Sequence, residues 1–254
     1  VRAQNENKKL LVSIHPMYAR VQLTQLNYPT PDFPNALTMF LRKHIEGSFI
    51  ERIEQVGLDR ILKITLRGRN EFKDLVEYHL YIEIMGKHSN FILTNKEDKI
   101  LECLKRVSPS DSIRIMQPGI TYSYPPLLEK KNPFENRPET TNLVKEFEGF
   151  SKDLAEEIAS RMEQGEDFKT IMNEIKESKE LYITRDDKEK YHVIPLHCFG
   201  KKIDQYHIDH NGKSVYHTHH TSHGYIQLSG DLCQCIKVNY RSYILALDIC
   251  KLCI

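Results

Sequence analysis

Asp59 and Arg60 are adjacent charged residues in this 254-residue chain that could form an ion pair or bind a ligand. They open the stretch LDRILKITLR, residues 58–67, in which apolar and polar residues alternate as in a β-strand. Counting back by two from Leu62 places Arg60 on the apolar face, where an unpaired guanidinium is costly to bury. Because neighbouring strand residues point to opposite faces, Asp59 and Arg60 each need a separate partner. A structural ion pair and a ligand-binding pair both satisfy this requirement.

A second candidate is Lys87 with His88, which stand at a predicted turn in the sequence EIMGKHSN, before Ser89 and Asn90. These side chains offer several hydrogen-bond donors, which suits a phosphate or a ribose. Polar residues are also the ordinary content of turns, because they hydrogen-bond to their own backbone. Both interpretations of this turn stay open.

A third candidate is Gly149, Phe150 and Ser151, which with Ala155 resemble a helix-hairpin-helix motif whose second glycine is replaced by serine. In that motif a tight turn directs backbone N–H groups at a phosphate, beside the start of a helix. A glycine that ends one helix and a serine that caps the next give the same spacing in any helical hairpin. A phosphate-binding site and a plain helical turn both fit this sequence.

Cysteines gather near the end of the chain, where two close pairs of thiols could hold Zn²⁺. The four residues are Cys233, Cys235, Cys250 and Cys253. The composition changes in the same region, since residues 1–200 contain 22 glutamates and residues 201–254 contain none. Cys-x-Cys is also an uncommon zinc knuckle. We therefore favour an atypical tail, such as one produced by a frameshift, over a zinc site, and we expect no cofactor.

The composition as a whole indicates a globular protein whose net charge is too small to attract nucleic acid or a membrane by itself. The net charge is +1, with 40% hydrophobic and 28% charged residues. No apolar run approaches 18 residues and no signal-peptide pattern is present, so a cytoplasmic chain without a membrane partner is expected. The chain begins within a predicted strand, which suggests that its natural opening is missing.

The strands and helices predicted from the sequence, which must position these residues, indicate an α+β fold. The alternation pattern gives strands within 10–24, 48–56, 60–67, 78–93 and 100–106. Helical patterns cover 35–46, 142–147, 151–162 and 167–178. The predicted domains are a sheet-rich domain at 1–127, a helical domain at 128–179, a returning β-hairpin at 180–199, and the atypical tail at 200–254, frameshifted or disordered.

Five blocks of sequence resemble the N-terminal region of the NFACT family, whose bacterial members are called RqcH and are also known as fibronectin-binding protein A. In order, they are LLVSIHPMYARVQLT, PDFPNALTMFLRKHIEGSFI, QVGLDRILKITL, EIMGKHSNFIL and KRVSPSDSIRIMQPGITYSYPP. The resemblance covers residues 8 to about 197. It implies a domain with a formamidopyrimidine-DNA-glycosylase-like fold, incomplete at its start, followed by a helix-hairpin-helix domain.

The resemblance also implies a function. RqcH-like proteins bind large ribosomal subunits that hold a stalled nascent chain, and recruit alanyl-tRNA to extend that chain with a C-terminal alanine tail. Asp59 and Arg60 match an Asp-Arg pair of the family's tRNA-recognition surface, and the resemblance favours a phosphate site at Gly149–Ala155. No catalytic residue is implied, because peptidyl transfer is the reaction of the ribosome, so the chain is expected not to be an enzyme.

Three departures from the family limit the expected activity, and two other classes of function are alternatives. By the resemblance, we expect the chain to lack the family's opening segment, its coiled coil and its C-terminal domain, and residues 201–254 do not resemble the family's continuation. A DNA glycosylase of the same superfamily would begin with proline and glutamate, whereas this chain begins Val1-Arg2. An extracellular adhesin that binds fibronectin is the alternative implied by the older family name.

Overall fold

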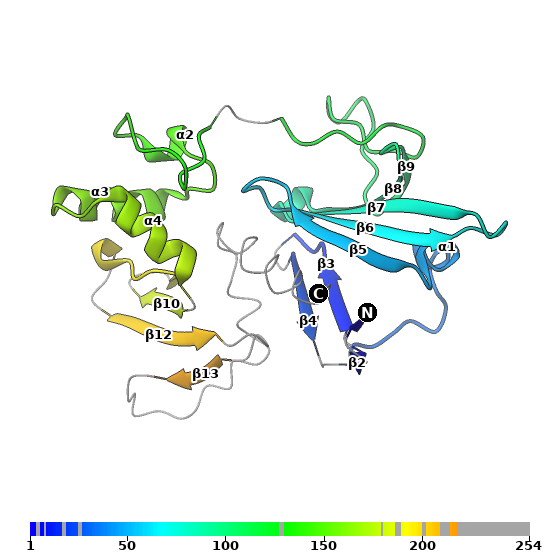
Figure 1. The fold of residues 1–254 in the computed structure, drawn as a ribbon, viewed down its shortest axis with the longest axis horizontal. Helices are drawn as coiled ribbons and strands as arrows, with labels where there is room; N and C mark the ends of the chain where they lie inside the picture. The colour runs from blue at the N-terminus through cyan, green and yellow to red at the C-terminus, as the bar shows by residue number, and fades with distance from the viewer. Residues whose placement is uncertain are drawn as a thin grey trace. The chain divides into compact units, whose positions relative to one another are not determined.

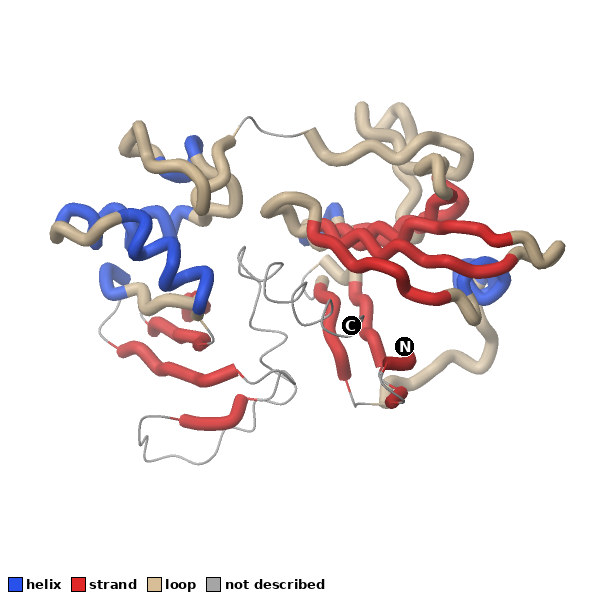
Figure 2. The backbone as a smooth tube through the Cα atoms, viewed as in Figure 1, coloured by secondary structure: helices blue, strands red, loops and turns tan. Residues whose placement is uncertain are grey.

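The computed structural model describes the chain except residues 4, 5, 8, 17, 18, 25, 26, 127–129, 179, 186–188, 200, 201, 209–213 and 218–254, which are grey in Figure 2. The chain divides into two compact units at residues 127–128, and each unit is described by itself. The α+β class is confirmed. The predicted domain boundaries stay predictions. Among the described residues, no helix is long and apolar enough to cross a membrane.

The first unit is built on a five-stranded antiparallel sheet in which each strand pairs with the next along the chain (Figure 1). Its strands are β5 (Phe49–Gln55), β6 (Ile61–Arg69), β7 (Leu75–Glu83), β8 (Asn90–Asn95) and β9 (Ile100–Cys103). The last strand is shorter than the predicted 100–106. Because the sheet is a meander, the β5–β6 loop and the β7–β8 connection leave it at the same end.

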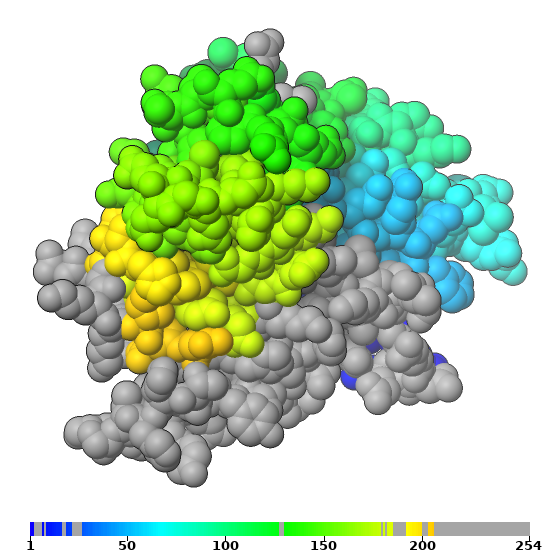
Figure 3. Space-filling model, turned by 60° about the vertical axis from the view of Figure 1, so that its left-hand side comes forward, coloured from blue at the N-terminus to red at the C-terminus, as the bar shows by residue number. Residues whose placement is uncertain are grey.

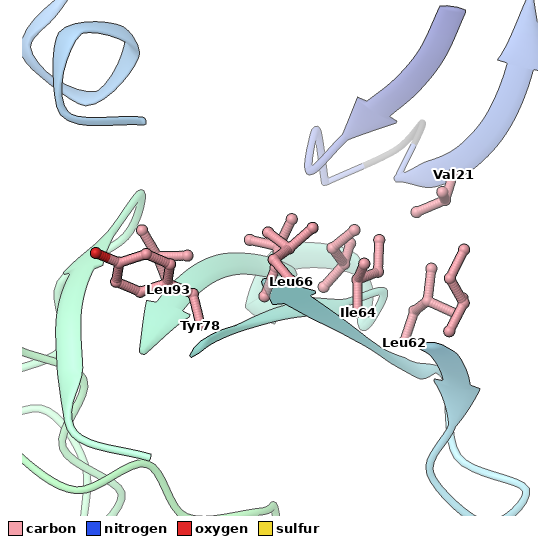
Figure 4. Close-up of a cluster of buried hydrophobic side chains, with 9 residues drawn as sticks. Val21, Leu62, Ile64, Leu66, Tyr78 and Leu93 are labelled. Carbon is pink, nitrogen blue, oxygen red and sulfur yellow. The ribbon is translucent and has the colours of Figure 1, made fainter. Parts of the chain in front are cut away.

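One face of this sheet carries the larger core, as the alternation in β6 predicted. Leu62, Ile64 and Leu66 are buried together with Tyr78 and Leu93 of the neighbouring strands (Figure 4). Three further elements add apolar side chains to this cluster: the hairpin of β3 (Lys9–Ser13) and β4 (Arg20–Thr24), and helix α1 (Ala36–Ile45). The short strands β1 (Arg2–Ala3) and β2 (Glu6–Asn7) pair with each other.

The opposite face of the sheet carries a second, more polar cluster. Its buried members are Ile61, Tyr81, Ile92, Ile100, Cys103, Met116 and Tyr122. The side of β6 opposite Leu62, Ile64 and Leu66 is therefore partly buried as well, since Ile61 is 1% and Thr65 is 5% exposed.

The described part of the second unit contains three helices and a four-stranded sheet. The helices are α2 (Leu143–Glu146), α3 (Lys152–Glu163) and α4 (Phe168–Glu177), which confirms the predicted segments to within one or two residues. The sheet has the order β11-β10-β12-β13, with β10 (Glu180–Arg185), β11 (Glu189–His192), β12 (Lys202–Ile208) and β13 (Ser214–His217). The sheet thus continues into residues assigned from the sequence to the tail.

Buried carboxylates connect the parts of the second unit. Glu157 of α3 is 1% exposed and accepts a hydrogen bond of 3.0 Å from the backbone N–H of Cys198, in the turn η2 (His197–Phe199). The surfaces of α3 and η2 are coloured green and yellow in Figure 3. Glu146 accepts bonds from the backbone N–H groups of Glu139 and Thr140. Burial opposes its ionisation, but these bonds lower the pKa of Glu146 to about 2.

Candidate nucleic-acid interface

The β5–β6 loop is a short, closed turn that presents Asp59 and Arg60. The backbone N–H of Val56 donates to the carbonyl of Ile61 at 3.0 Å, which closes the loop. Gly57 adopts φ +56°, a left-handed conformation that glycine adopts without steric cost. The Gln55 side chain also donates to the carbonyl of Asp59 at 2.9 Å. These contacts fix the backbone from which the two charged side chains project.

The predicted placement of Arg60 on the apolar face of a strand is wrong. Strand β6 begins at Ile61, so Asp59 and Arg60 lie in the preceding turn. There Asp59 is exposed and Arg60 is half-buried. The Asp59 carboxylate accepts a 2.8 Å bond from the backbone N–H of Arg60, and this bond turns the acid toward its neighbour's main chain. The alternation could not show this, because it continues into the turn that the hydrogen bonds define.

The structural ion pair considered for Arg60 is absent from the described part of the chain. Two other arginines of the sheet have acidic partners: Arg52 lies 3.0 Å from Glu54, and Arg67 lies 2.7 Å from Glu51. Neither Asp59 nor Arg60 has a charged partner among the residues that the structure describes. Arg60 therefore presents a planar set of donors that suits a phosphate or a base edge.

Lys87 and His88 lie at the same end of the sheet as Arg60. They belong to the 3₁₀ turn η1 (Gly86–His88), where both are exposed. The backbone N–H of Ile84 donates to the carbonyl of Arg60 at 2.8 Å, which joins the two loops directly. Two sequence candidates that stand 27 positions apart, Arg60 and Lys87, are thus brought onto neighbouring loops.

Lys105 holds this end of the unit together, and it was not singled out from the sequence. Its Nζ donates to the carbonyls of Ile14 at 3.3 Å and of Lys87 at 3.2 Å, so it joins the end of β3 to the β7–β8 connection. The side chain of Asn90 bonds to both the N–H and the carbonyl of Lys105. The only sequence signal for Lys105 was its place at the start of the last of the five sequence blocks. We call Asp59, Arg60, Lys87, His88 and Lys105 the loop-end cluster.

The Gly149–Ser151 turn lies in the second unit and is not part of the loop-end cluster. Gly149 adopts φ +74°, and the Phe150 ring is buried against Phe147 and Phe168. The Ser151 hydroxyl caps α3 by accepting from the N–H of Leu154 at 3.1 Å. The side chains therefore serve the helical hairpin, and only backbone N–H groups are left for a phosphate. A phosphate site at this turn stays a prediction.

No metal site is formed within the described residues. The structure brings no group of three or more histidine, cysteine or acidic side chains together in that part of the chain. Cys103 is buried and Cys198 is exposed, and both are free thiols. The four cysteines considered for zinc, Cys233, Cys235, Cys250 and Cys253, lie outside the described residues.

The fold and the loop-end cluster define a mixed α+β protein with a surface of charged donors on the loops of an antiparallel sheet. A family model described as NFACT N-terminal and middle domains matches residues 1–243. The chain belongs to this family, which confirms the resemblance seen in the five sequence blocks.

Individual relatives agree with this assignment. The Rqc2 homolog RqcH of Bacillus subtilis is 50% identical over 137 residues, which are 53% of this chain and 24% of that protein. The Rqc2 homolog RqcH of Streptococcus pneumoniae serotype 2 is 41% identical over 172 residues, 62% of this chain and 31% of that protein. The chain thus spans about a quarter to a third of the length of these relatives.

A solved structure also shares this fold. The N-terminal part of the fibronectin/fibrinogen-binding protein from Streptococcus suis superimposes with a TM-score of 0.68 at 34% identity. The match covers 79% of this chain and 79% of that chain.

Proposed function

We propose that this chain is a tRNA-binding part of a ribosome quality-control factor. In this role it binds alanyl-tRNA and the large ribosomal subunit, and supports alanine tailing of stalled nascent chains. The relatives named RqcH support the process, and the loop-end cluster supports the ligand. The proposal includes a cytoplasmic location and no enzymatic activity of the chain's own. A glycosylase-like fold of the first unit and a helix-hairpin-helix at 128–179 belong to the same proposal.

The observation that carries the proposal is the setting of Arg60. Within the described residues its guanidinium has no acidic partner, although it is half-buried on a loop fixed by backbone hydrogen bonds. A charged donor held in place without a protein partner suits an anionic ligand. Asp59 beside it can accept from a ribose hydroxyl or a base amino group, which tRNA offers together with phosphates.

The test is tRNA binding by the full chain, with Asp59→Ala and Arg60→Ala combined, at two salt concentrations. We expect the wild type to bind more weakly as salt rises, because phosphate contacts release counterions. The double variant should bind at least about 10-fold more weakly, since each charged contact contributes of the order of 1–3 kcal/mol. Equal affinity of the folded double variant would remove Asp59 and Arg60 from the site.

A matched control removes the same two charges elsewhere on the first unit. Lys43 and Glu71 form an exposed ion pair of 3.1 Å, so Lys43→Ala with Glu71→Ala leaves the net charge unchanged, as the test variant does. Such exposed pairs contribute little to stability. The control should bind tRNA like the wild type. If it loses affinity as strongly as the test variant, the effect is a general one of surface charge.

Binding of fibronectin is the second candidate function, favoured by the name of the Streptococcus suis structure. The same proteins can be tested on immobilised fibronectin and fibrinogen. Binding that is unchanged by the Asp59 and Arg60 substitutions would assign that activity to another surface. Absence of binding together with tRNA binding would leave the ribosomal role as the function of this chain.

A further inference from the structure

Three tyrosines form a cluster on the second face of the first unit's sheet. The rings of Tyr81 and Tyr122 are stacked with centroids 3.9 Å apart. Tyr124 meets both edge-on, at 5.9 Å from Tyr81 and 5.3 Å from Tyr122. The two stacked rings are 0% and 6% exposed, whereas Tyr124 is 41% exposed. The buried pair therefore supports one ring that is open to solvent.

The exposed ring is held in place by its neighbours along the chain. The Arg114 guanidinium donates to the carbonyl of Ser123 at 2.7 Å and also binds the buried carboxylate of Glu83. Tyr122 donates to Glu83 at 2.9 Å. Pro125 follows Tyr124 directly and restricts its backbone to extended conformations. A ligand that stacks on Tyr124 would thus meet a ring that is already ordered, which lowers the entropic cost of binding.

A cation lies against the buried neighbour of this ring. Lys63 Nζ is 5.4 Å from the centre of the Tyr81 ring and also interacts electrostatically with Asp98, which accepts from Tyr81 at 2.7 Å. Glu83 binds Arg114. An exposed aromatic ring such as that of Tyr124 can bind single-stranded nucleic acid by stacking on a base.

The tyrosine cluster and the loop-end cluster are built on the same two strands. Glu83, which holds Tyr122, pairs across the sheet with Ile61, and Ile61 directly follows Arg60. Lys63 and Tyr81 are the next cross-strand pair on the same face. Both clusters thus belong to the β6–β7 part of the first unit's sheet.

We propose that Tyr124 is a stacking site for an unpaired base of a bound RNA. This inference rests on the proposed tRNA binding and adds a residue for a part of the RNA that is not base-paired. A duplex hides the faces of its bases, so this site should not contribute to binding of fully paired RNA. Arg60 and Lys87, which suit phosphates, should contribute to both.

The test compares the full chain with Tyr124→Ala and with Tyr124→Phe, which keeps the ring and removes only the hydroxyl. The ligands are a short single-stranded RNA that carries 2-aminopurine, and a fully paired, blunt-ended RNA duplex of equal charge. We expect Tyr124→Ala to weaken binding of the single strand about 10-fold, as stacking on one base contributes, and to leave binding of the duplex unchanged. Tyr124→Phe should bind like the wild type, and 2-aminopurine fluorescence should be quenched only when the ring is present.

The outcomes separate this inference from the proposed function. If Tyr124→Ala binds the single strand like the wild type while the Asp59 and Arg60 double variant does not, the stacking site is overturned and the proposed function stands. Equal loss on the single strand and on the fully paired duplex would also overturn it, since a general structural defect is then the cause. If the wild type binds no RNA, both proposals fail. Unquenched fluorescence of the wild-type complex overturns the stacking site without any variant.

Discussion

At the scale of single residues, Arg60 and Lys105 have different roles in the loop-end cluster. Arg60 has no acidic partner among the described residues, so its donors are available to a ligand. Lys105 uses its ammonium group within the fold, on the carbonyls of Ile14 and Lys87. A lysine engaged in this way is a positioning residue, because it acts on the ligand only through the loops that it joins.

Lys105→Met tests this positioning role. It keeps the length of the side chain and removes two charge-assisted hydrogen bonds, so we expect it to lower the free energy of unfolding by about 1–3 kcal/mol. It should also weaken tRNA binding several-fold while leaving the salt dependence of affinity unchanged, since no phosphate contact is lost. Urea unfolding and binding at several salt concentrations measure both effects.

The control for Lys105 is Lys169→Met, at an exposed position of α4. It should change neither stability nor binding. A fall in the salt dependence with Lys105→Met, equivalent to the loss of one phosphate contact, would contradict the positioning role and make Lys105 a direct ligand of the RNA.

At the scale of elements, the loops matter more for the site than the strands do. Gly86 opens the turn that carries Lys87 and His88, and its φ of +59° strains any other residue. A Cβ at Gly86 would lie 3.7 Å from the carbonyl oxygen of Pro16, an ordinary contact. Gly86→Ala therefore introduces backbone strain without a clash. We expect it to cost about 1–2 kcal/mol of stability and to weaken tRNA binding by shifting the turn.

Gly165 offers the matched control for this change. It lies in the second unit with φ +94° and has nothing within 4 Å of an added Cβ. Gly165→Ala should cost a similar amount of stability and leave tRNA binding unchanged. If both variants weaken binding equally, lowered stability explains the effect, and the geometry of the β7–β8 turn does not control the site.

The elements also show how far the sequence could predict the structure. The helical patterns predicted the helices to within one or two residues, and Asn35 and Ser151 cap the first turns of α1 and α3. The alternation in β6 correctly predicted that the face with Leu62, Ile64 and Leu66 is buried. It failed for Arg60, because periodicity does not reveal where backbone pairing starts. It also missed Lys105, whose partners lie 18 and 91 positions away.

At the scale of the whole molecule, each unit buries apolar side chains of its own among the residues that the structure describes. The two clusters that enclose the first unit's sheet draw all their members from residues before 127. The helices of the second unit bury a set of their own, which includes Phe147, Ile158 and Ile171. Because stability is cooperative only among residues that share packing, damage to one core should remain local.

Ile64→Ala and Ile158→Ala test this independence, since each removes a fully buried side chain from one unit. We expect each to cost about 2–5 kcal/mol in its own unit, through lost burial and the cavity left behind. In hydrogen exchange, Ile158→Ala should accelerate exchange in α3 and α4 while β6 to β8 stay protected. Ile64→Ala should instead accelerate exchange in β6 to β8 while α3 and α4 stay protected. Of the two variants, only Ile64→Ala should weaken RNA binding near the unfolding temperature of the first unit. If either variant accelerates exchange equally in both units, the chain unfolds as a single cooperative body, and the loop-end cluster then depends on the second unit for its stability.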